Sequence, residues 1–530
     1  MMTITPKMKE QEIQAAGNSS SSPPARGHSC PQQLTDGSDA PARADVAAGW
    51  KAGLPLWQVF LIGLAGAGCL HLAYAFPRLS LLLLGTFVSF AALSLARSRR
   101  KAFYPVLLIG LAVYAPQLGF FWTIFGGAAV LLWLVLALWL ALFSVIAWRI
   151  RTRWGVRAWL VALPFLWTGI EYFRSELYFL RFSWINAAYA LAPLPTVSWL
   201  VSGGVYAVSF LLMSMVSLCL FMKWKGDMRV AQSGAGATGM SPFRRWLPRF
   251  LPSLVCVFAL ALITNVPETS LTIDRVGVRP LKVAGIQSEF PQADQVPGLL
   301  DKALAAHPDA ELFVLSEYTF DGPVTTNVLN WCRMNGKHLI VGGKDPVGDD
   351  FYNTAFVVGP AGEIIFKQVK AVPIQFFADG LPAPEQKVWD SPWGKLGILT
   401  CYDLSYTRVV DELVRQGAQA LINPTMDMME WGEYQHELHS RVPPVRAAEH
   451  GIPLFRVASS GVSQLIDRHG RVTASAPFAR DEAVIGGELM LGPAGRLPLD
   501  RWLAPLCVGL SGVVVLVSFL PSRRRSFLDS

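Results

Sequence analysis

Long apolar stretches separated by short polar loops dominate the first half of the chain and recur near its end. Stretches long enough to cross a bilayer lie at about 55–75, 78–96, 103–119, 121–148, 156–172, 196–222, 247–265 and 502–520. Clusters of Arg and Lys follow every second stretch, whereas the alternate loops are poor in both. Cytoplasmic loops carry the positive charge in membrane proteins. The pattern therefore predicts eight spans, with both chain ends in the cytoplasm.

The pattern changes between residues 266 and 500. There, short apolar runs typical of strands alternate with amphipathic stretches such as Gln295–Ala306 and Thr407–Gln416. About 230 residues of this kind predict one α/β domain with its own core. By the charge rule, this domain lies on the extracytoplasmic side of the membrane. The predicted organisation is 1–50, a disordered cytoplasmic tail; 51–265, seven spans; 266–500, the α/β domain; and 501–530, the eighth span and a basic cytoplasmic tail.

Composition supports a membrane protein and excludes several other classes. The 530 residues are 52% hydrophobic and 16% charged, with a net charge of +8, against about a quarter charged in soluble proteins. The seven cysteines are scattered without a C-x-x-C pair or zinc-ligand spacing, so neither a disulfide framework nor a metal site is predicted. We expect no cofactor and no nucleic-acid partner.

Three reactive side chains follow apolar runs of the α/β domain. Glu317 comes after the run LFVL, Lys370 ends the run GEIIFKQVK, and Cys401 follows the run GILT. Strand ends can converge at one edge of a sheet. Glu317 could then remove the thiol proton of Cys401, while Lys370 stabilises a tetrahedral oxyanion. Taken singly, each residue also has an ordinary interpretation. Cys401 could be a buried core cysteine, and Glu317 and Lys370 could be solvated surface residues.

Several motifs in one order resemble the nitrilase, or carbon–nitrogen hydrolase, superfamily. They are VAGIQ at 283–287, LSEY, YNTA at 352–355, GEIIFKQVK, GILTCYD, and the segment 444–467. The resemblance implies a four-layer α-β-β-α sandwich. It also implies that Glu317, Lys370 and Cys401 form the catalytic triad of that superfamily.

A domain of this kind between the last two spans resembles the apolipoprotein N-acyltransferase family. Glu171, Arg174, the FSW at 182–184 and Tyr189 are similar to that family's E-x-x-R, F-P-W and G-Y pattern. The resemblance therefore suggests that Arg174 and Trp184 bind substrate. The aromatic stretch 173–195 is either a belt at the membrane interface or a surface that grips lipid beside the domain.

The sequence departs from the family around the lysine. Counting from Gly362 assigns the catalytic lysine to Lys370, with Lys367 as the second choice. The family's loop glutamate is missing, and Gln375 or Phe376 stands near its position. The triplet SSG at 459–461 replaces an N-x-G type motif.

The resemblance implies a two-step acyl transfer in the bacterial cytoplasmic membrane. Cys401 would take an acyl chain from a phospholipid as a thioester and pass it to the amine of a diacylglyceryl-cysteine at a prolipoprotein N-terminus. Tyr402 could support the oxyanion through its backbone N–H, and Asp403 could orient Lys370 or its loop. The enzyme is expected to be a monomer. The alternatives are a membrane-tethered amidase or nitrilase that passes the acyl group to water, and a catalytically inactive envelope scaffold.

Overall fold

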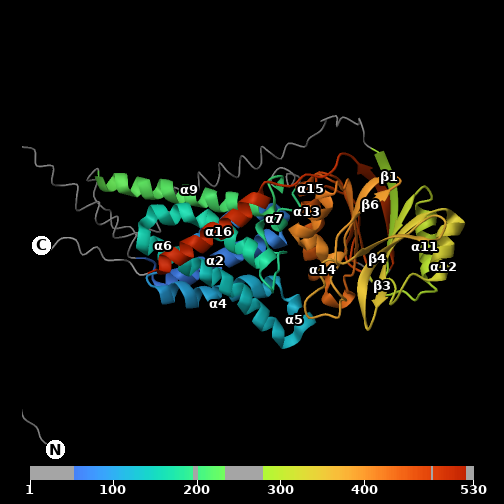
Figure 1. Ribbon diagram of the computed structural model, residues 1–530. Coiled ribbons are helices and arrows are strands. Elements are labelled where there is room, and N and C mark those ends of the chain that lie inside the picture. The colour runs from blue at the N-terminus through green and yellow to red at the C-terminus, as the bar shows by residue number, and fades with distance from the viewer. Residues whose placement is uncertain (1–52, 195–200, 233–278, 479–481, 521–530) are drawn as a thin grey trace, which may run out of the picture.

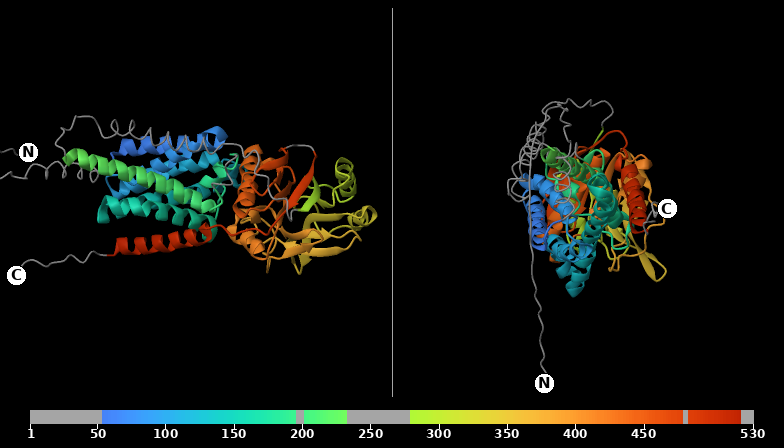
Figure 2. Two further views of the ribbon diagram at one scale, coloured as in Figure 1. Left: turned by 90° about the horizontal axis from the view of Figure 1, so that it is seen from above. Right: turned by 90° about the vertical axis from the view of Figure 1, so that its left-hand side faces the viewer.

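The computed structural model describes residues 53–194, 201–232, 279–478 and 482–520 of the chain. Figures 1 and 2 show two parts end to end: a bundle of helices, and an α/β domain against one end of that bundle. The last helix returns from the domain to run alongside the bundle. The predicted tail 1–50 and the predicted span 247–265 lie outside the described residues.

Apolar sequence builds the bundle from helices that pack along much of their length. These helices are α2 (Leu56–Ala75), α3 (Leu83–Leu93), α4 (Arg99–Gln117), α5 (Phe120–Phe125), α6 (Ala129–Tyr172), α7 (Ala187–Ala190), α9 (Val205–Gln232) and α16 (Asp500–Phe519). Close approach requires glycine in places: a Cβ on Gly110 of α4 would meet Ala137 of α6 at 2.7 Å.

Within the described residues, four helical stretches are long and apolar enough to cross a membrane. They are Leu56–Ala75, Phe120–Leu177, Val205–Met228 and Asp500–Phe519. The second holds two predicted spans, because Gly155 interrupts α6 with a non-helical φ of 87°. The shorter helix Pro77–Leu93 falls below this length, and α4 begins with charged residues and contains two prolines. The membrane character of the bundle is supported, whereas the count of eight spans is not confirmed.

Two six-stranded sheets form the α/β domain. The first runs in the order β12-β1-β2-β3-β4-β5 and the second in the order β11-β10-β9-β8-β7-β6. The first sheet contains β1 (Arg279–Gln287), β2 (Leu312–Val314), β3 (His338–Val347), β4 (Asp350–Val358), β5 (Ile364–Val369) and β12 (Ala483–Leu491). The second contains β6 (Val388–Ser391), β7 (Gly394–Ile398), β8 (Ala420–Thr425), β9 (Leu454–Ala458), β10 (Ser463–Ile466) and β11 (Val472–Ala476).

Helices cover the outer face of each sheet. Helices α11 (Val296–Ala306) and α12 (Thr326–Asn335) share an apolar core with the first sheet. Helices α13 (Thr407–Arg415) and α15 (Val442–His450) lie between the second sheet and the bundle. A third core, including Val283, Ile422 and Phe455, fills the space between the sheets. The predicted α-β-β-α sandwich is confirmed, and α11 and α13 lie within a residue of their predicted bounds.

Buried charges join the domain to the bundle. Arg501 at the start of α16 donates to Asp411 at 2.7 Å and to Glu449 at 2.8 Å. Glu449 also accepts a hydrogen bond from the backbone N–H of Val205, where α9 begins. Because buried charges are costly unless paired, the two parts are held in one relative position by groups that each part supplies.

Loss of the ring of Phe455 should destabilise the domain. Its side chain is fully buried between the sheets, so Phe455→Ala is expected to cost about 3–5 kcal/mol of unfolding free energy. Denaturant titration in detergent measures this cost. Val472→Ala, at an exposed site on β11, is the control and should change the free energy of unfolding by less than about 0.5 kcal/mol. Equal effects of the two substitutions would contradict the packing described.

Candidate active site

Cys401 lies in a strained turn that follows a buried strand. Strand β7 pairs in parallel with β8, and beyond it residues Cys401–Ser405 form a 3-10 turn. Cys401 has a φ of +49°, a conformation that costs a non-glycine residue about 1–3 kcal/mol and recurs at functional sites. Asn423 on β8 supports the turn by donating to the carbonyl of Leu399 at 2.9 Å. The sulfur therefore has a fixed position at the edge of the sheet.

Lys370 and Glu317 form a fully buried ion pair. Their Nζ and Oε1 atoms are 2.8 Å apart, and both side chains are 0% exposed. Glu317 follows β2 and Lys370 follows β5, so two strand ends of the first sheet supply the pair. Glu317 also accepts hydrogen bonds from Asn353 at 2.6 Å and from the backbone N–H of Met426 at 2.8 Å. The latter contact reaches across to the second sheet, which carries Cys401.

Asp379 is a second carboxylate on the lysine, and the sequence reasoning did not single it out. Its Oδ2 lies 2.7 Å from Lys370 Nζ. Three further donors hold Asp379: the hydroxyl of Tyr318, the side-chain amide of Asn353, and the backbone N–H of Ile374. Asp379 thus brings a carboxylate to the lysine from the same loop in which the family's glutamate was expected. The only signal in the sequence was an acidic residue nine positions after Lys370.

The side chains of Cys401, Lys370, Glu317 and Asp379 shift one another's pKa values. Burial raises the pKa of the Cys401 thiol well above its usual value; the Glu317 carboxylate raises it further, and Lys370 opposes the rise. Burial would lower the pKa of Lys370, but Asp379 and Glu317 raise it well above its usual range. The pKa of Glu317 is raised, chiefly by burial. These shifts favour a protonated thiol and a charged Lys370.

The structure distinguishes the two candidate lysines. Lys367 lies at the surface and pairs with Asp345 at 2.7 Å, whereas Lys370 is inside the site. Asp403 accepts hydrogen bonds from the backbone N–H groups of Ala371 and Val372 at 3.0 and 2.8 Å. It therefore holds the loop that follows Lys370, which is one of the two roles expected of it.

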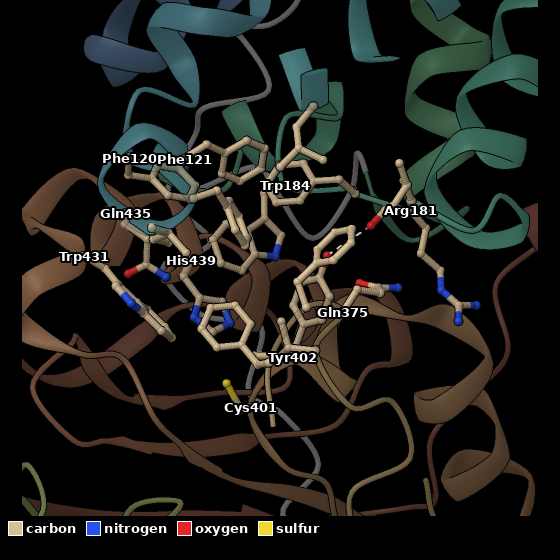
Figure 3. Close-up of a pocket in the computed structure, with 18 of the residues that line it drawn as sticks. Phe120, Phe121, Arg181, Trp184, Gln375, Cys401, Tyr402, Trp431, Gln435 and His439 are labelled. Atoms are coloured by element: carbon tan, nitrogen blue, oxygen red, sulfur yellow. Dashed lines mark hydrogen bonds between the residues drawn. The ribbon is translucent and has the colours of Figure 1, made fainter. Parts of the chain in front are cut away.

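A largely apolar pocket opens above Cys401, between the bundle and the domain (Figure 3). It encloses about 870 Å³ of space between atoms, part of it open to the outside. Tyr402 and Trp184 both line it, and the Tyr402 ring packs edge-on against Trp184 at 5.8 Å. The bundle contributes most of the apolar wall: Phe120, Phe121, Ile124, Phe125, Leu132, Val135 and Leu136.

Arg174 does not line this pocket. Its guanidinium donates to Asn186 at 2.7 Å and to the carbonyl of Phe182 at 3.0 Å, and it is almost completely buried. It thus braces the segment that carries Trp184. Gln375 and Phe376, near the position of the missing glutamate, do line the pocket. Among the described residues, no group of three or more His, Cys, Asp or Glu side chains is arranged to hold a metal ion.

Comparisons with known proteins agree with this arrangement. The family model described as "Apolipoprotein N-acyltransferase N-terminal domain" matches residues 66–218, and the model described as "Carbon-nitrogen hydrolase" matches residues 284–495. The apolipoprotein N-acyltransferase of Geobacter metallireducens is 27% identical over 88% of this chain and 96% of its own length. That of Shewanella oneidensis is 23% identical over 80% of this chain and 88% of its own. A carbon–nitrogen hydrolase structure from Helicobacter pylori is 19% identical, with a TM-score of 0.35, over 47% of this chain and 97% of its own.

The fold and the two matched models define a membrane protein that carries a carbon–nitrogen hydrolase domain. Over most of its length the chain is similar to apolipoprotein N-acyltransferases, and it matches the N-terminal domain model of those proteins ahead of the carbon–nitrogen hydrolase model.

The pKa of Cys401 can be tested by alkylation. Glu317→Gln removes the negative charge that raises the thiol pKa, so the thiolate fraction at pH 8 should increase. We expect iodoacetamide to label Cys401 several-fold faster in this variant, as followed by mass spectrometry, with the pH profile shifted to lower pH. Asp390→Asn, at an exposed site paired with Lys395 at 3.8 Å, is the control and should leave the rate unchanged. Slower labelling of the Glu317 variant would contradict the electrostatics described.

Proposed function

We propose that this protein transfers an acyl chain from a membrane phospholipid, through a thioester on Cys401, to the N-terminal amine of a diacylated prolipoprotein. The observation that carries the proposal is the position of the thiol. Cys401 lies in the wall of an apolar pocket whose other side belongs to the helical bundle. A fatty acyl chain can enter such a pocket from the bilayer and bring its ester carbonyl to the sulfur.

In the first half-reaction the thiol of Cys401 attacks the ester carbonyl. Glu317 accepts the thiol proton as the carbon–sulfur bond forms, which offsets the raised pKa of the thiol. Lys370 contacts two carboxylates among the described residues; an ammonium group has three donors, so one can stabilise the oxyanion. The backbone N–H of Tyr402 is a second candidate donor. The ester bond then breaks, and the lysophospholipid oxygen takes the proton from Glu317.

In the second half-reaction the amine of the acceptor attacks the thioester. A carbon–nitrogen bond forms, the carbon–sulfur bond breaks, and the amine proton ends on the sulfur. Two steps with a covalent intermediate replace one difficult exchange. The pocket also excludes water from the thioester, since its walls are mainly apolar.

We further propose that the domain lies on the extracytoplasmic side of the cytoplasmic membrane and that the protein acts as a monomer. The basic segment 97–101 lies where α4 begins, and the basic segment 149–157 spans the break in α6 at Gly155; the positive-inside rule assigns such basic segments to the cytoplasmic side. Cysteine-scanning with a membrane-impermeant thiol reagent tests the sidedness. A cysteine introduced at exposed Met334 of the domain should be labelled in intact spheroplasts, and one at Lys101 should not.

The alternative function is hydrolysis of an amide or ester by the same thiol. The two functions differ in the molecule that takes the acyl group from Cys401, which is the lipopeptide amine for a transferase and water for a hydrolase. Purified protein is incubated with a phospholipid whose acyl chain carries an alkyne, and a diacylated lipopeptide is then added. We expect a hydroxylamine-sensitive adduct on Cys401, followed by an N-acylated lipopeptide. Release of free fatty acid without an N-acyl product would overturn the transferase in favour of the hydrolase.

An inactive scaffold is the remaining alternative, and Cys401→Ala tests it. This variant should form no adduct and should fail to replace the native enzyme in cells. Full complementation by Cys401→Ala would instead support the scaffold.

The two lysines offer a matched pair of variants. Lys370→Met leaves Glu317 and Asp379 facing each other without a cation and removes the proposed oxyanion donor. We expect the rate of adduct formation to fall by about 10²–10³-fold. Lys367→Met loses an exposed ion pair, which is worth about 0–1 kcal/mol, and should retain near-normal activity. Comparable losses in both variants would argue against the role of Lys370.

A further inference from the structure

His439 is a buried histidine in the pocket wall that the mechanism above does not use. It ends helix α14 (Glu433–His439) and stacks on Trp184, with ring centroids 4.4 Å apart and planes inclined by 13°. Both Cys401 and His439 line the pocket. In the view of Figure 3 the imidazole lies between Trp184 and the sulfur. A titratable nitrogen base therefore lines the same pocket as the sulfur.

Asp427 fixes the orientation of this imidazole. Its Oδ1 lies 2.8 Å from His439 Nδ1. A carboxylate can only accept, so we assign the ring proton to Nδ1 and the lone pair to Nε2. In this tautomer Nδ1 cannot accept from Arg456, whose Nη2 donates to Asp427 Oδ2 instead. Arg456 lies 3.0 Å from Nδ1 and is paired with the other oxygen of Asp427. The ion pair keeps Asp427 charged, because Arg456 and His439 lower its pKa against the effect of burial.

The SSG triplet that departs from the family holds Asp427 in place. Ser459 accepts a hydrogen bond from the backbone N–H of Asp427 and donates to its carbonyl, both at 3.0 Å. Ser460 donates to the same carbonyl at 2.5 Å. Gly461 lacks a Cβ where one would meet Asp427 at 2.4 Å. The altered triplet and the histidine thus belong to one structural unit.

Nε2 of His439 has no hydrogen-bond partner among the residues that the structure describes, although it is buried. An unpaired buried acceptor costs about 1–3 kcal/mol. A substrate that donates a proton or a hydrogen bond at this point would remove that cost. Burial and the neighbouring Arg456 lower the pKa of His439, although Asp427 opposes them; this shift favours the neutral ring, which can accept a proton.

Glu317 is poorly suited to serve the second nucleophile as well as the first. Its carboxylate already accepts hydrogen bonds from Lys370, Asn353 and Met426, and it does not line the pocket. An attacking amine occupies the pocket, where His439 offers a free lone pair. The two nucleophiles of a two-step transfer would then have separate bases.

We propose that His439, oriented by Asp427, accepts the proton of the attacking amine in the second half-reaction. This inference rests on the proposed acyl transfer. As the nitrogen bonds to the thioester carbon, its proton passes to Nε2; the carbon–sulfur bond breaks, and the imidazolium returns the proton to the Cys401 thiolate. His439 is then a catalytic residue of amine transfer and plays no part in loading the thiol.

The test measures the two half-reactions separately in full-length protein in detergent. Loading is the single-turnover rate of adduct formation with the alkyne phospholipid. Transfer is the rate at which the isolated acyl-enzyme passes its chain to a diacylated lipopeptide. His439→Phe keeps a ring on Trp184 but removes both nitrogens. Loading should stay within about threefold of the native rate, and transfer should fall by about 10²–10⁴-fold. His439→Gln, which also lacks a base, should show the same split.

His436→Phe is the matched control, because His436 is a buried imidazole on the same helix, 3.9 Å from Asp427, that stacks on Phe478 away from the pocket. Its ratio of transfer to loading should equal the native ratio. Equal losses in both half-reactions of the His439 variants, or no loss in transfer, would overturn the role of His439 while leaving the acyl transfer intact. Failure of the native protein to load, or its release of free acid alone, would overturn the proposed function and the inference together.

Discussion

One buried cation organises the site. Lys370 is fully enclosed, and an enclosed ammonium ion is tolerated only when it is paired and hydrogen-bonded. The pairing requires Glu317 from the end of β2 and Asp379 from the loop after β5 to meet at one point. Glu317 in turn accepts from Met426 after β8, so the second sheet is tied to the same charge. Asp403, in the turn that carries Cys401, fixes the backbone just after Lys370. Removing the cation would therefore loosen the thiol as well as the carboxylates.

The same turn is also the point where the domain meets the bundle. Ser405 accepts a hydrogen bond from the indole N–H of Trp184 at 2.8 Å, and Arg446 donates to the carbonyl of Ser405 at 2.9 Å. The bundle segment that supplies Trp184 is itself held by Arg174 and Asn186. Nucleophile, pocket wall and apolar helices thus share one set of contacts. Under the proposed function this continuity matters, because the turn that carries Cys401 is built into the surface that meets the helical bundle.

Site residues that directly follow a strand could be predicted from the sequence. Site residues in loops, which only the tertiary fold brings together, could not. Glu317, Lys370 and Cys401 each follow an apolar run; Glu317 and Lys370 come from strand ends of the first sheet, and Cys401 comes from a strand end of the second. Asp379 lies in a loop with no periodic pattern, and nothing in the sequence places it beside the lysine. The contact between His439 and Asp427 could not be predicted either. It depends on how β8, β9 and α14 pack together, which the sequence of this segment does not show. Arg174 donates to Asn186 and Phe182 in the segment that carries Trp184, and its predicted role in substrate binding stays a prediction. The span count was less predictable, because α6 runs through two predicted spans and another lies outside the described residues.

The raised pKa of the Cys401 thiol fits a two-step transfer better than a permanently ionised nucleophile would. A neutral thiol in an apolar pocket is protected from reaction until an ester carbonyl arrives and Glu317 can take its proton. A thiolate with a high pKa is a strong nucleophile but a reluctant leaving group. Breaking the thioester therefore needs charge stabilisation from Lys370 and a proton for the sulfur. A neutral imidazole that collects the amine proton and returns it to sulfur supplies that need. The environment that slows the departure of the thiolate is then the reason for a second base in the pocket.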